Sequence, residues 1–219
     1  MADIDPQLLE RTKTLGVMFD GLANSLVGPP TDLRIFFTFA HGYITKKIGK
    51  HIGLFSNPNA LMRLNDSFAS TYLAAMNGAP HADWQKAFKI CKGEQDAVRS
   101  GFIGLIFIGP VAYESCGACM ANVHIRRDLR DALNKVKDVD PQDYGNILIF
   151  VMEGNLYAEK MIRGRAKGAL MVMTSLPFAA KLNLDVKQWR NEVFTQCYGK
   201  PVPDPSDAFA AAYHRGEGR

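Results

Sequence analysis

The sequence predicts an all-α fold, a single-domain bundle of about eight helices around a buried central helix. Apolar residues recur at steps of three and four along most of the chain, which is the spacing of one helix face. Asp or Asn precedes Pro at four points, where the first side chain can cap free backbone N–H groups and proline fits the first helical turn. No segment alternates strictly between apolar and polar residues, so we expect no sheet.

The first half of the chain contains three clear helical patterns. A first helix is expected at residues 8–26, after Asp5-Pro6, and a second at 33–48. A third follows Asn57-Pro58 and ends at Asn77-Gly78, where glycine can adopt the left-handed conformation of a helix cap.

The second half continues the helical pattern. A short helix is expected at 83–93, closed by its glycine, and the apolar stretch 101–123 is expected to form the central helix. Longer patterns follow at 144–162 and 185–197, and Asp204-Pro205 predicts the start of a last, brief helix. We therefore expect one domain over residues 1–219, with the tail 200–219 loosely attached.

Charge and hydropathy exclude two classes of partner. The net charge of +4 comes without a dense basic stripe, so we expect no nucleic-acid binding. The stretch 101–123 is long enough to cross a bilayer. Its Gly109-Pro110 break and the polar residues of its second half favour a buried helix, and we expect no transmembrane segment.

The N-terminus lacks the basic and then apolar order of a signal peptide, which predicts a cytoplasmic protein with four free thiols. Cys116 and Cys119 form one C-x-x-C pair, whereas a four-cysteine zinc site needs two close pairs. Buried thiols are the favoured interpretation, and a zinc site or a redox dithiol is the alternative.

His124 and Asp128 are the residues most suggestive of chemistry. They are four apart on a predicted helix, so their side chains can touch, and a carboxylate beside an imidazole fixes its tautomer and raises its basicity. This is the arrangement of a general base. A boundary histidine that only ties two helices together is the structural alternative.

A second polar line runs along the helix after Pro141, through Asp143, Asn146, Glu153 and Tyr157, and a solvated helix face is the alternative interpretation. If this line faces His124, the two helices would form an acid–base cluster in an apolar surround, where burial raises the pKa of a carboxyl group. The predicted substrate-binding residues are Asn122, Asp143, Asn146, Tyr72 and Arg63.

The block Asn122-Val123-His124-Ile125-Arg126-Arg127-Asp128-Leu129 resembles the N-x-H-I-N-x-D-L signature of the bacterial domain-of-unknown-function family numbered 5995. Blocks upstream, including Arg63-Leu64 and Tyr72, and downstream, at Asp143 and Asn146-Ile147-Leu148, extend the likeness over residues 36–153. The resemblance implies an all-helical domain whose His, Asn and Asp positions cluster, and it implies no activity. Arg126 stands where the family has Asn, so a ligand contact through that amide is not expected here.

These observations predict an enzyme without a bound cofactor that acts on a small, largely apolar molecule. His124, oriented by Asp128, would move a proton in an isomerase, cyclase or lyase reaction, because no nucleophile motif or phosphate loop is visible. A non-catalytic protein that binds a small hydrophobic ligand is the main alternative, with methionines such as Met171 and Met173 forming an adaptable pocket. Metal or haem binding by His124 is the third hypothesis.

Overall fold

The structure is a computed structural model, and it describes residues 3–26, 32–78, 81–99, 109–165 and 178–217. Within these ranges it contains helices and no strand, which confirms the predicted all-α bundle. The elements are α1 (Pro6–Ser25), α2 (Ile35–Lys50), the 3₁₀ turn η1 (Ile52–Leu54), α3 (Pro58–Met76), α4 (Ala82–Arg99), α5 (Gly109–Val123), the π-helical turn η3 (His124–Leu129), α6 (Arg130–Lys135), α7 (Pro141–Arg165), α8 (Phe178–Tyr198) and α9 (Asp207–Glu217). None of the helices in the described ranges combines the length and the apolar character that a membrane crossing requires.

Helix starts follow the predicted capping residues at three of the four Asp/Asn-Pro pairs. The side-chain oxygens of Asp5, Asn57 and Asp140 accept hydrogen bonds from backbone N–H groups of the following turn, at 2.8, 3.3 and 2.7 Å. At the fourth pair the prediction is wrong. α9 begins at Asp207, and its cap is Ser206, whose Oγ accepts from the Phe209 N–H at 3.2 Å. A serine at this position satisfies the same free N–H groups as an aspartate would.

Of the two glycines expected to end helices, Gly78 does and Gly93 does not, and Gly199 ends a further helix. Gly78 after α3 and Gly199 after α8 have φ of +96° and +70°, which glycine adopts without steric cost. α4 was expected to end at Gly93 but continues to Arg99. A single glycine inside a helix costs only about 1 kcal/mol relative to alanine, so it need not terminate one.

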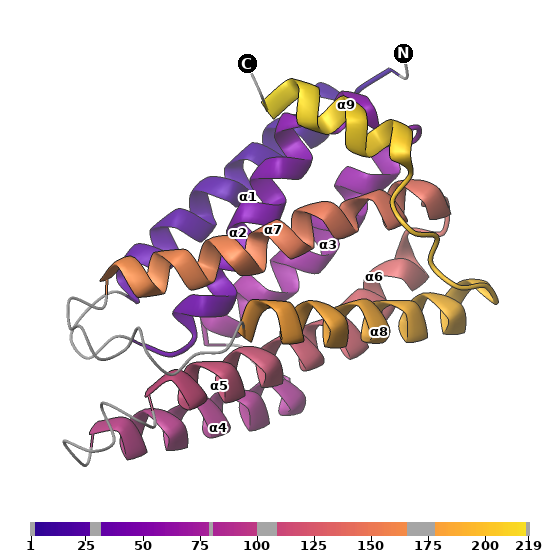
Figure 1. Cartoon of the computed structure of the whole chain (residues 1–219). Coiled ribbons are helices and arrows are strands. Elements are labelled where there is room, and N and C mark those ends of the chain that lie inside the picture. Colours follow the sequence, from indigo (N-terminus) through magenta and orange to yellow (C-terminus); the bar gives the residue numbers. More distant parts are fainter. Residues whose placement is uncertain (1–2, 27–31, 79–80, 100–108, 166–177, 218–219) are drawn as a thin grey trace.

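The most buried helix is α2, which lies between α1 and α7 (Figure 1). Most of its residues are buried, including both faces of the run from Ile35 to Gly42. α7 crosses it closely at Gly154, where an added Cβ would lie 2.9 Å from the carbonyl oxygen of Ala40. Only glycine permits this approach of two backbones.

The expectation that residues 101–123 form the central helix is wrong for the part that can be compared. Residues 101–108 lie outside the described ranges. The side chains from Ser115 to Val123 are buried or half-buried. Their helix α5 nevertheless lies beside α4 at one edge of the molecule (Figure 1), where α4, α8 and one end of α2 cover it.

The tail 200–219 is not loosely attached over its described part. Phe209 and Tyr213 on α9 are 4% and 1% exposed, and the Tyr213 hydroxyl donates to Glu153 of α7 at 2.5 Å. Glu217 at the end of α9 pairs with Lys47 and Lys50 of α2. α9 therefore packs on the C-terminal end of α2, on η1 and on the middle of α7, as part of the core (Figure 1).

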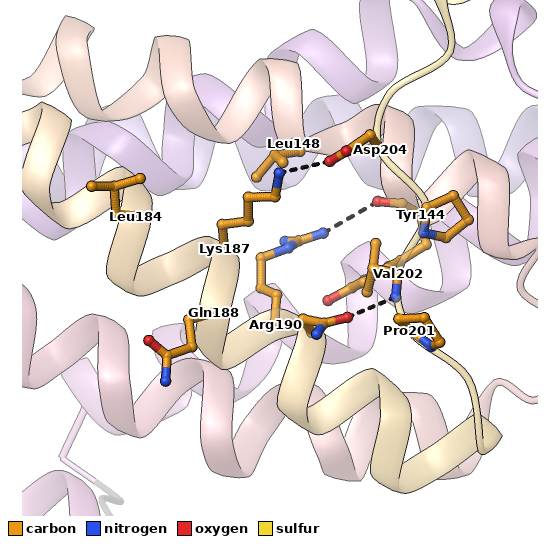
Figure 2. Close-up of a pocket in the computed structure, with 11 residues that line it drawn as sticks. Tyr144, Leu148, Leu184, Lys187, Gln188, Arg190, Pro201, Val202 and Asp204 are labelled. Atoms are coloured by element: carbon orange, nitrogen blue, oxygen red, sulfur yellow. Dashed lines mark hydrogen bonds and ion pairs between the residues drawn. The ribbon is translucent and has the colours of Figure 1, made fainter.

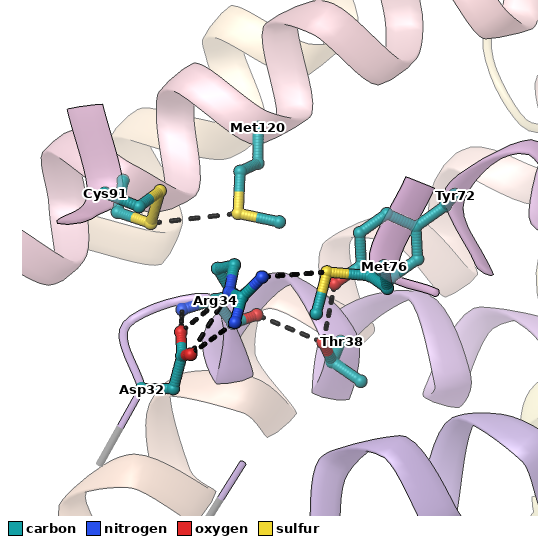
Figure 3. Close-up of a disulfide and its surroundings, with 8 residues drawn as sticks. Asp32, Arg34, Thr38, Tyr72, Met76, Cys91 and Met120 are labelled. Carbon is teal, nitrogen blue, oxygen red and sulfur yellow. Dashed lines mark hydrogen bonds and ion pairs between the residues drawn. A yellow bond between two sulfur atoms is a disulfide. The ribbon is translucent and has the colours of Figure 1, made fainter. Parts of the chain in front are cut away.

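Cys91 of α4 and Cys116 of α5 form a disulfide, with Cα atoms 4.8 Å apart (Figure 3). The prediction of four free thiols is thus wrong for two of them, while Cys119 and Cys197 are free and half-buried. The pairing arises because α4 and α5 pack side by side, a contact that the spacing of cysteines in the sequence does not reveal.

Candidate functional site

The predicted contact between His124 and Asp128 is present and buried. Nδ1 of His124 lies 2.8 Å from Oδ2 of Asp128, and both residues are 1% exposed. The same Oδ2 accepts a hydrogen bond from the indole N–H of Trp84 in α4, at 3.0 Å. When Asp128 is ionised it can only accept, so Nδ1 carries the hydrogen and Nε2 keeps a free lone pair. Nε2 has no hydrogen-bond partner among the residues that the structure describes.

The pair lies in η3, a π-helical turn inserted into the otherwise continuous helix formed by α5 and α6. Such turns are rare and occur frequently at functional sites. The extra residue changes the direction in which the following side chains point, and here all of His124, Ile125, Asp128 and Leu129 are buried. A straight α-helix predicts His124 at the boundary with solvent, whereas the structure buries it.

Aromatic side chains enclose the His124 ring. Phe68 of α3 stacks on it with ring centroids 3.5 Å apart, and His41 and Phe37 of α2 meet it edge to face at 4.7 and 5.1 Å. This surround excludes water from the imidazole. The apolar environment predicted for the pair is therefore present.

Burial shifts the pKa of each member of the pair toward its neutral form. The pKa of His124 is well below its ordinary value because of burial and the positive charge of Arg190. Burial raises the pKa of Asp128 to about 6, although the hydrogen bond from Trp84 and the charge of Arg127 act in the opposite direction. At neutral pH the arrangement is a neutral imidazole beside a carboxylate.

A small cavity of about 40 Å³ adjoins His41, on the side of the bundle formed by α2, α3, α7 and α8. We call it the inner cavity. Its lining is His41, Ile44, Ile48, Leu61, Leu64, Asn65, Phe68, Leu129, Tyr144, Ile147, Val151 and Arg190. His124 does not line the inner cavity. Its ring contacts His41 and Phe68, and these two residues line the cavity.

Three residues that line the inner cavity have a buried side-chain polar atom without a partner in the described ranges. These atoms are Nε2 of His41, Nδ2 of Asn65 and the hydroxyl oxygen of Tyr144. Each of these residues is less than 5% exposed. Because buried polar groups in proteins are nearly always hydrogen-bonded, three such atoms around one cavity indicate that something polar belongs there.

A larger groove of about 380 Å³ lies on the outer side of the same wall (Figure 2). α8 lines it with Leu184, Lys187 and Arg190, and the segment after α8 lines it with Val202 and Asp204. Tyr144 and Arg190 line both the groove and the inner cavity. They form the partition between the surface and the interior.

The arginine of this partition is buried and carries an unbalanced charge. Arg190 is 7% exposed, and its guanidinium lies over the Tyr144 ring, 4.3 Å from the centroid. Its one hydrogen bond is to the backbone carbonyl of Tyr144, at 3.4 Å (Figure 2). No carboxylate of the described ranges pairs with it, since Asp204 and Glu192 bind Lys187 and Arg126 instead.

The other predicted site residues do not join His124 in one cluster. Asp143 accepts hydrogen bonds from Ser56 and Asn57 at 2.7–2.9 Å, and therefore holds the start of α3. Asn146 accepts from the backbone of Ser206 at 2.9 Å and holds the segment before α9. The expectation that the polar line of α7 faces His124 is wrong, because these side chains point to connecting segments instead.

The other three predicted binding residues, Tyr72, Asn122 and Arg63, lie in three separate parts of the molecule. Tyr72 lies beside the His124 ring, with centroids 6.0 Å apart, but its hydroxyl is bound to Thr38 at 2.7 Å (Figure 3). Asn122 is half-buried and lines neither the inner cavity nor the groove. Arg63 is on the surface, where it pairs with Asp138 at 2.6 Å. Of the five predicted binding residues, Tyr72 alone is shown in contact with the aromatic side chains around the His124 ring in the described ranges.

Sequence reasoning missed His41, Asn65, Tyr144 and Arg190. His41 and Asn65 are single polar residues on otherwise apolar helix faces, and Arg190 follows Val186 by four residues on the buried stripe of α8. A polar residue on such a stripe is the signal that could have found each of them. Their convergence on one cavity requires the packing of four helices.

In the ranges that the structure describes, no three His, Cys, Asp or Glu side chains are placed to hold a metal ion together. Met171 and Met173, expected to contribute to a pocket, lie outside these ranges.

Comparison with known proteins gives no match: no protein-family model, no curated protein and no solved structure is similar to the chain. The likeness to the domain-of-unknown-function family therefore stays a prediction.

Proposed function

We propose that this protein binds a small molecule, with a polar group of the ligand in the inner cavity and the remainder in the groove. The observation that carries the proposal is that His41, Asn65 and Tyr144, each with an unpartnered buried polar atom in the described ranges, line one cavity together with the charged Arg190. A concave apolar site with a few convergent polar groups is the usual form of a small-molecule site.

The sizes of the two spaces support this division of the ligand. A water molecule occupies roughly 10–15 Å³ of such a cavity, so the inner cavity accommodates a group of about three heavy atoms. The groove is about nine times larger by the two volumes, 380 against 40 Å³, and Leu148, Leu184 and Val202 give it an apolar lining. A small ligand with an apolar body and a polar head fits this arrangement.

Filling the inner cavity tests the proposal. Val151→Leu places an extra methylene at the cavity wall, whereas Val193→Leu makes the same change at a buried position that lines neither space. The full-length chain is purified without denaturants, and bound compounds are measured by native mass spectrometry and extraction. We expect a small molecule on the unchanged protein and on Val193→Leu, and its loss from Val151→Leu. Equal occupancy in both variants would place the ligand elsewhere and end the proposal.

Proton transfer by the His124–Asp128 pair is the second candidate function. The observation that favours it is Nε2 of His124, which is buried without a partner in the described ranges while Nδ1 is bound to Asp128. This is the state of a general base, and His41 lies between it and the inner cavity. The reaction would then be an isomerase, cyclase or lyase step on the bound molecule.

The two candidates are separated by what happens to the ligand once it has been identified. His124→Ala and Asp128→Asn should each abolish turnover of that compound if the pair is catalytic, and leave its chemical structure unchanged in the bound state. Turnover that continues at the same rate in both variants would leave binding as the function.

The cytoplasmic location predicted from the N-terminal residues stays a proposal. Thiol counting on protein isolated from its own cell under alkylating conditions tests it. Four reactive thiols after unfolding would support a reducing compartment, and two would contradict it because the disulfide between Cys91 and Cys116 leaves two free cysteines.

A further inference from the structure

Asn65, Tyr144 and Arg190, which line the inner cavity, offer hydrogen-bond donors. Oδ1 of Asn65 is taken by the Thr45 hydroxyl at 3.4 Å, so its unpartnered atom is the amide Nδ2, which can only donate. Burial raises the pKa of Tyr144 to about 12, so its hydroxyl keeps its proton. Arg190 offers further N–H groups beyond the one that the Tyr144 carbonyl accepts. A group that satisfies this set must be an acceptor.

Because Arg190 is positively charged, a neutral acceptor would satisfy its N–H groups but leave its charge unpaired. A buried cation without a partner is strongly unfavourable, whereas a paired and hydrogen-bonded one is tolerated. The acidic residues of the groove region are already bound to other cations, Asp204 to Lys187 at 2.6 Å and Glu192 to Arg126 at 2.8 Å. The lining of the inner cavity thus contains a positive charge and several donors without a negative group from the described parts of the chain.

The size of the inner cavity limits which kinds of anion can fit. A carboxylate has three heavy atoms, which matches the room in the inner cavity, and its two oxygens can accept from the parallel N–H groups of a guanidinium. The partition residues Tyr144 and Arg190 also line the groove. The Arg190 guanidinium covers the Tyr144 ring at 4.3 Å, so the chain attached to a carboxylate reaches the groove only when this guanidinium moves off the ring to pair with the acid.

We propose that the ligand is an organic monocarboxylic acid, whose carboxylate is held by Arg190, Tyr144 and Asn65 and whose apolar chain lies against Leu148, Leu184 and Val202 in the groove. This inference rests on the proposed binding function and adds the chemical class of the ligand. His41 also lines the cavity, and in the tautomer with its hydrogen on Nε2 it would add one more donor to the carboxylate.

The experiment is a calorimetric titration of the full-length protein with acetate, hexanoate, octanoate and the neutral hexanamide, at constant ionic strength. Binding of hexanoate at least tenfold tighter than hexanamide is expected. Tighter binding of hexanoate or octanoate than of acetate identifies a chain that occupies the groove, and equal binding of all three acids identifies the carboxylate alone as the ligand group.

Variants locate the site. Arg190→Met should weaken hexanoate binding more than a hundredfold, and Tyr144→Phe about tenfold, because it removes one hydrogen bond to a charged group. Arg126→Met, which removes a positive charge outside both spaces, should leave binding unchanged. Circular dichroism and the melting temperature verify that each variant is folded, and Tyr144→Phe retains the test if Arg190→Met is not.

Two results would overturn the inference in different ways. Hexanamide binding as tightly as hexanoate, and equally in wild type and Arg190→Met, would leave a small-molecule site that is not an acid site. No binding by any acid or amide, with Val151→Leu and Val193→Leu indistinguishable, would mean that the cavity holds only water and would remove the proposed function as well.

Discussion

Asp128 accepts two hydrogen bonds from buried donors with one oxygen atom, the indole N–H of Trp84 and Nδ1–H of His124. This connects α4 with η3 in a part of the core that water does not reach. An unsatisfied buried donor costs about 1–3 kcal/mol, so the carboxylate has a structural role whether or not the imidazole is catalytic.

Asp128→Ala should lower the free energy of unfolding by about 2–4 kcal/mol, because both donors lose their acceptor. Asp128→Asn keeps an oxygen at the same place and should cost about 1 kcal/mol. Urea unfolding at pH 7 measures both, with Asp131→Ala, an exposed acid in α6, as the control within about 0.5 kcal/mol of wild type. Equal losses in the two Asp128 variants would contradict the assigned hydrogen bonds.

Because several histidines are buried, we expect the free energy of unfolding to fall in acid. Burial lowers the pKa of His41, His51 and His124, so below about pH 6.5 the unfolded chain takes up protons that the folded chain does not. Burial raises the pKa of Asp128 to about 6, which acts in the opposite sense for one proton between about pH 4 and 6. The unfolded state still binds more protons, so the free energy of unfolding falls as the pH falls from 7 to 5.

His41→Gln should make this pH dependence shallower by about one proton, or about 1.4 kcal/mol per pH unit below pH 6. Thr12→Val changes another buried polar residue, one that does not titrate. It should shift the free energy of unfolding by the same amount at every pH and leave the slope unaltered. Denaturant unfolding at several pH values gives the slopes. An unaltered slope in His41→Gln would mean that the folded state protonates His41 as readily as the unfolded chain.

At the scale of elements, the pair formed by α4 and α5 depends on one covalent link. Cys91 and Cys116 are 2% and 0% exposed, and the Met120 sulfur lies 3.7 Å from the Cys116 sulfur, next to the α2–α3 contact (Figure 3). The same pair of helices supplies Trp84 and leads into η3. Loosening α4 therefore acts directly on the surround of His124.

Replacing both disulfide cysteines by Ala should lower the free energy of unfolding by about 3 kcal/mol, the loop-closure effect for a separation of 25 residues. Thermal unfolding of the double variant and of the reduced protein measures it, and Cys119→Ala is the control that removes a free cysteine. Four titratable thiols in the untreated, unfolded protein would show that the disulfide is absent.

The positions at which most helices begin and end depend on residues close in the sequence, and this is why they could be predicted. Asp5, Asn57 and Asp140 cap α1, α3 and α7, and Gly78 ends α3, through contacts within a few residues. The π-helical turn and the continuation of α4 beyond Gly93 could not be predicted in the same way. The π-helical turn lies where α3 and α8 pack against it. One glycine costs a helix only about 1 kcal/mol, so Gly93 by itself does not decide where α4 ends.

At the scale of the whole molecule, the segment between α8 and α9 closes one side of the groove. It packs on α7 at Gly145, where an added Cβ would lie 2.3 Å from the carbonyl oxygen of Pro203. Val202 and Asp204 of the same segment line the groove (Figure 2). The position of this segment therefore determines the shape of the proposed binding site.

Gly145→Ala should displace this segment and lower the free energy of unfolding by about 2 kcal/mol, since the clash is with backbone atoms that cannot rotate away. Gly93→Ala is the matched control, because a Cβ there meets nothing within 4 Å, and it should stabilise α4 by about 0.5–1 kcal/mol. Chemical denaturation measures both changes, and hydrogen exchange of residues 199–206 reports the displacement. Equal effects of the two substitutions would contradict the close contact.

The sequence by itself determined the all-α class, most helix boundaries and the contact between His124 and Asp128, because each depends on residues within one or two helical turns. Only the tertiary structure decided that α2 is the most buried helix, that Cys91 pairs with Cys116, and that Asp143 and Asn146 hold connecting segments. It also brought His41, Asn65, Tyr144 and Arg190 around one cavity from four helices. These contacts join residues far apart in the chain, and helical periodicity specifies which face of a helix is buried but not which other helix covers it.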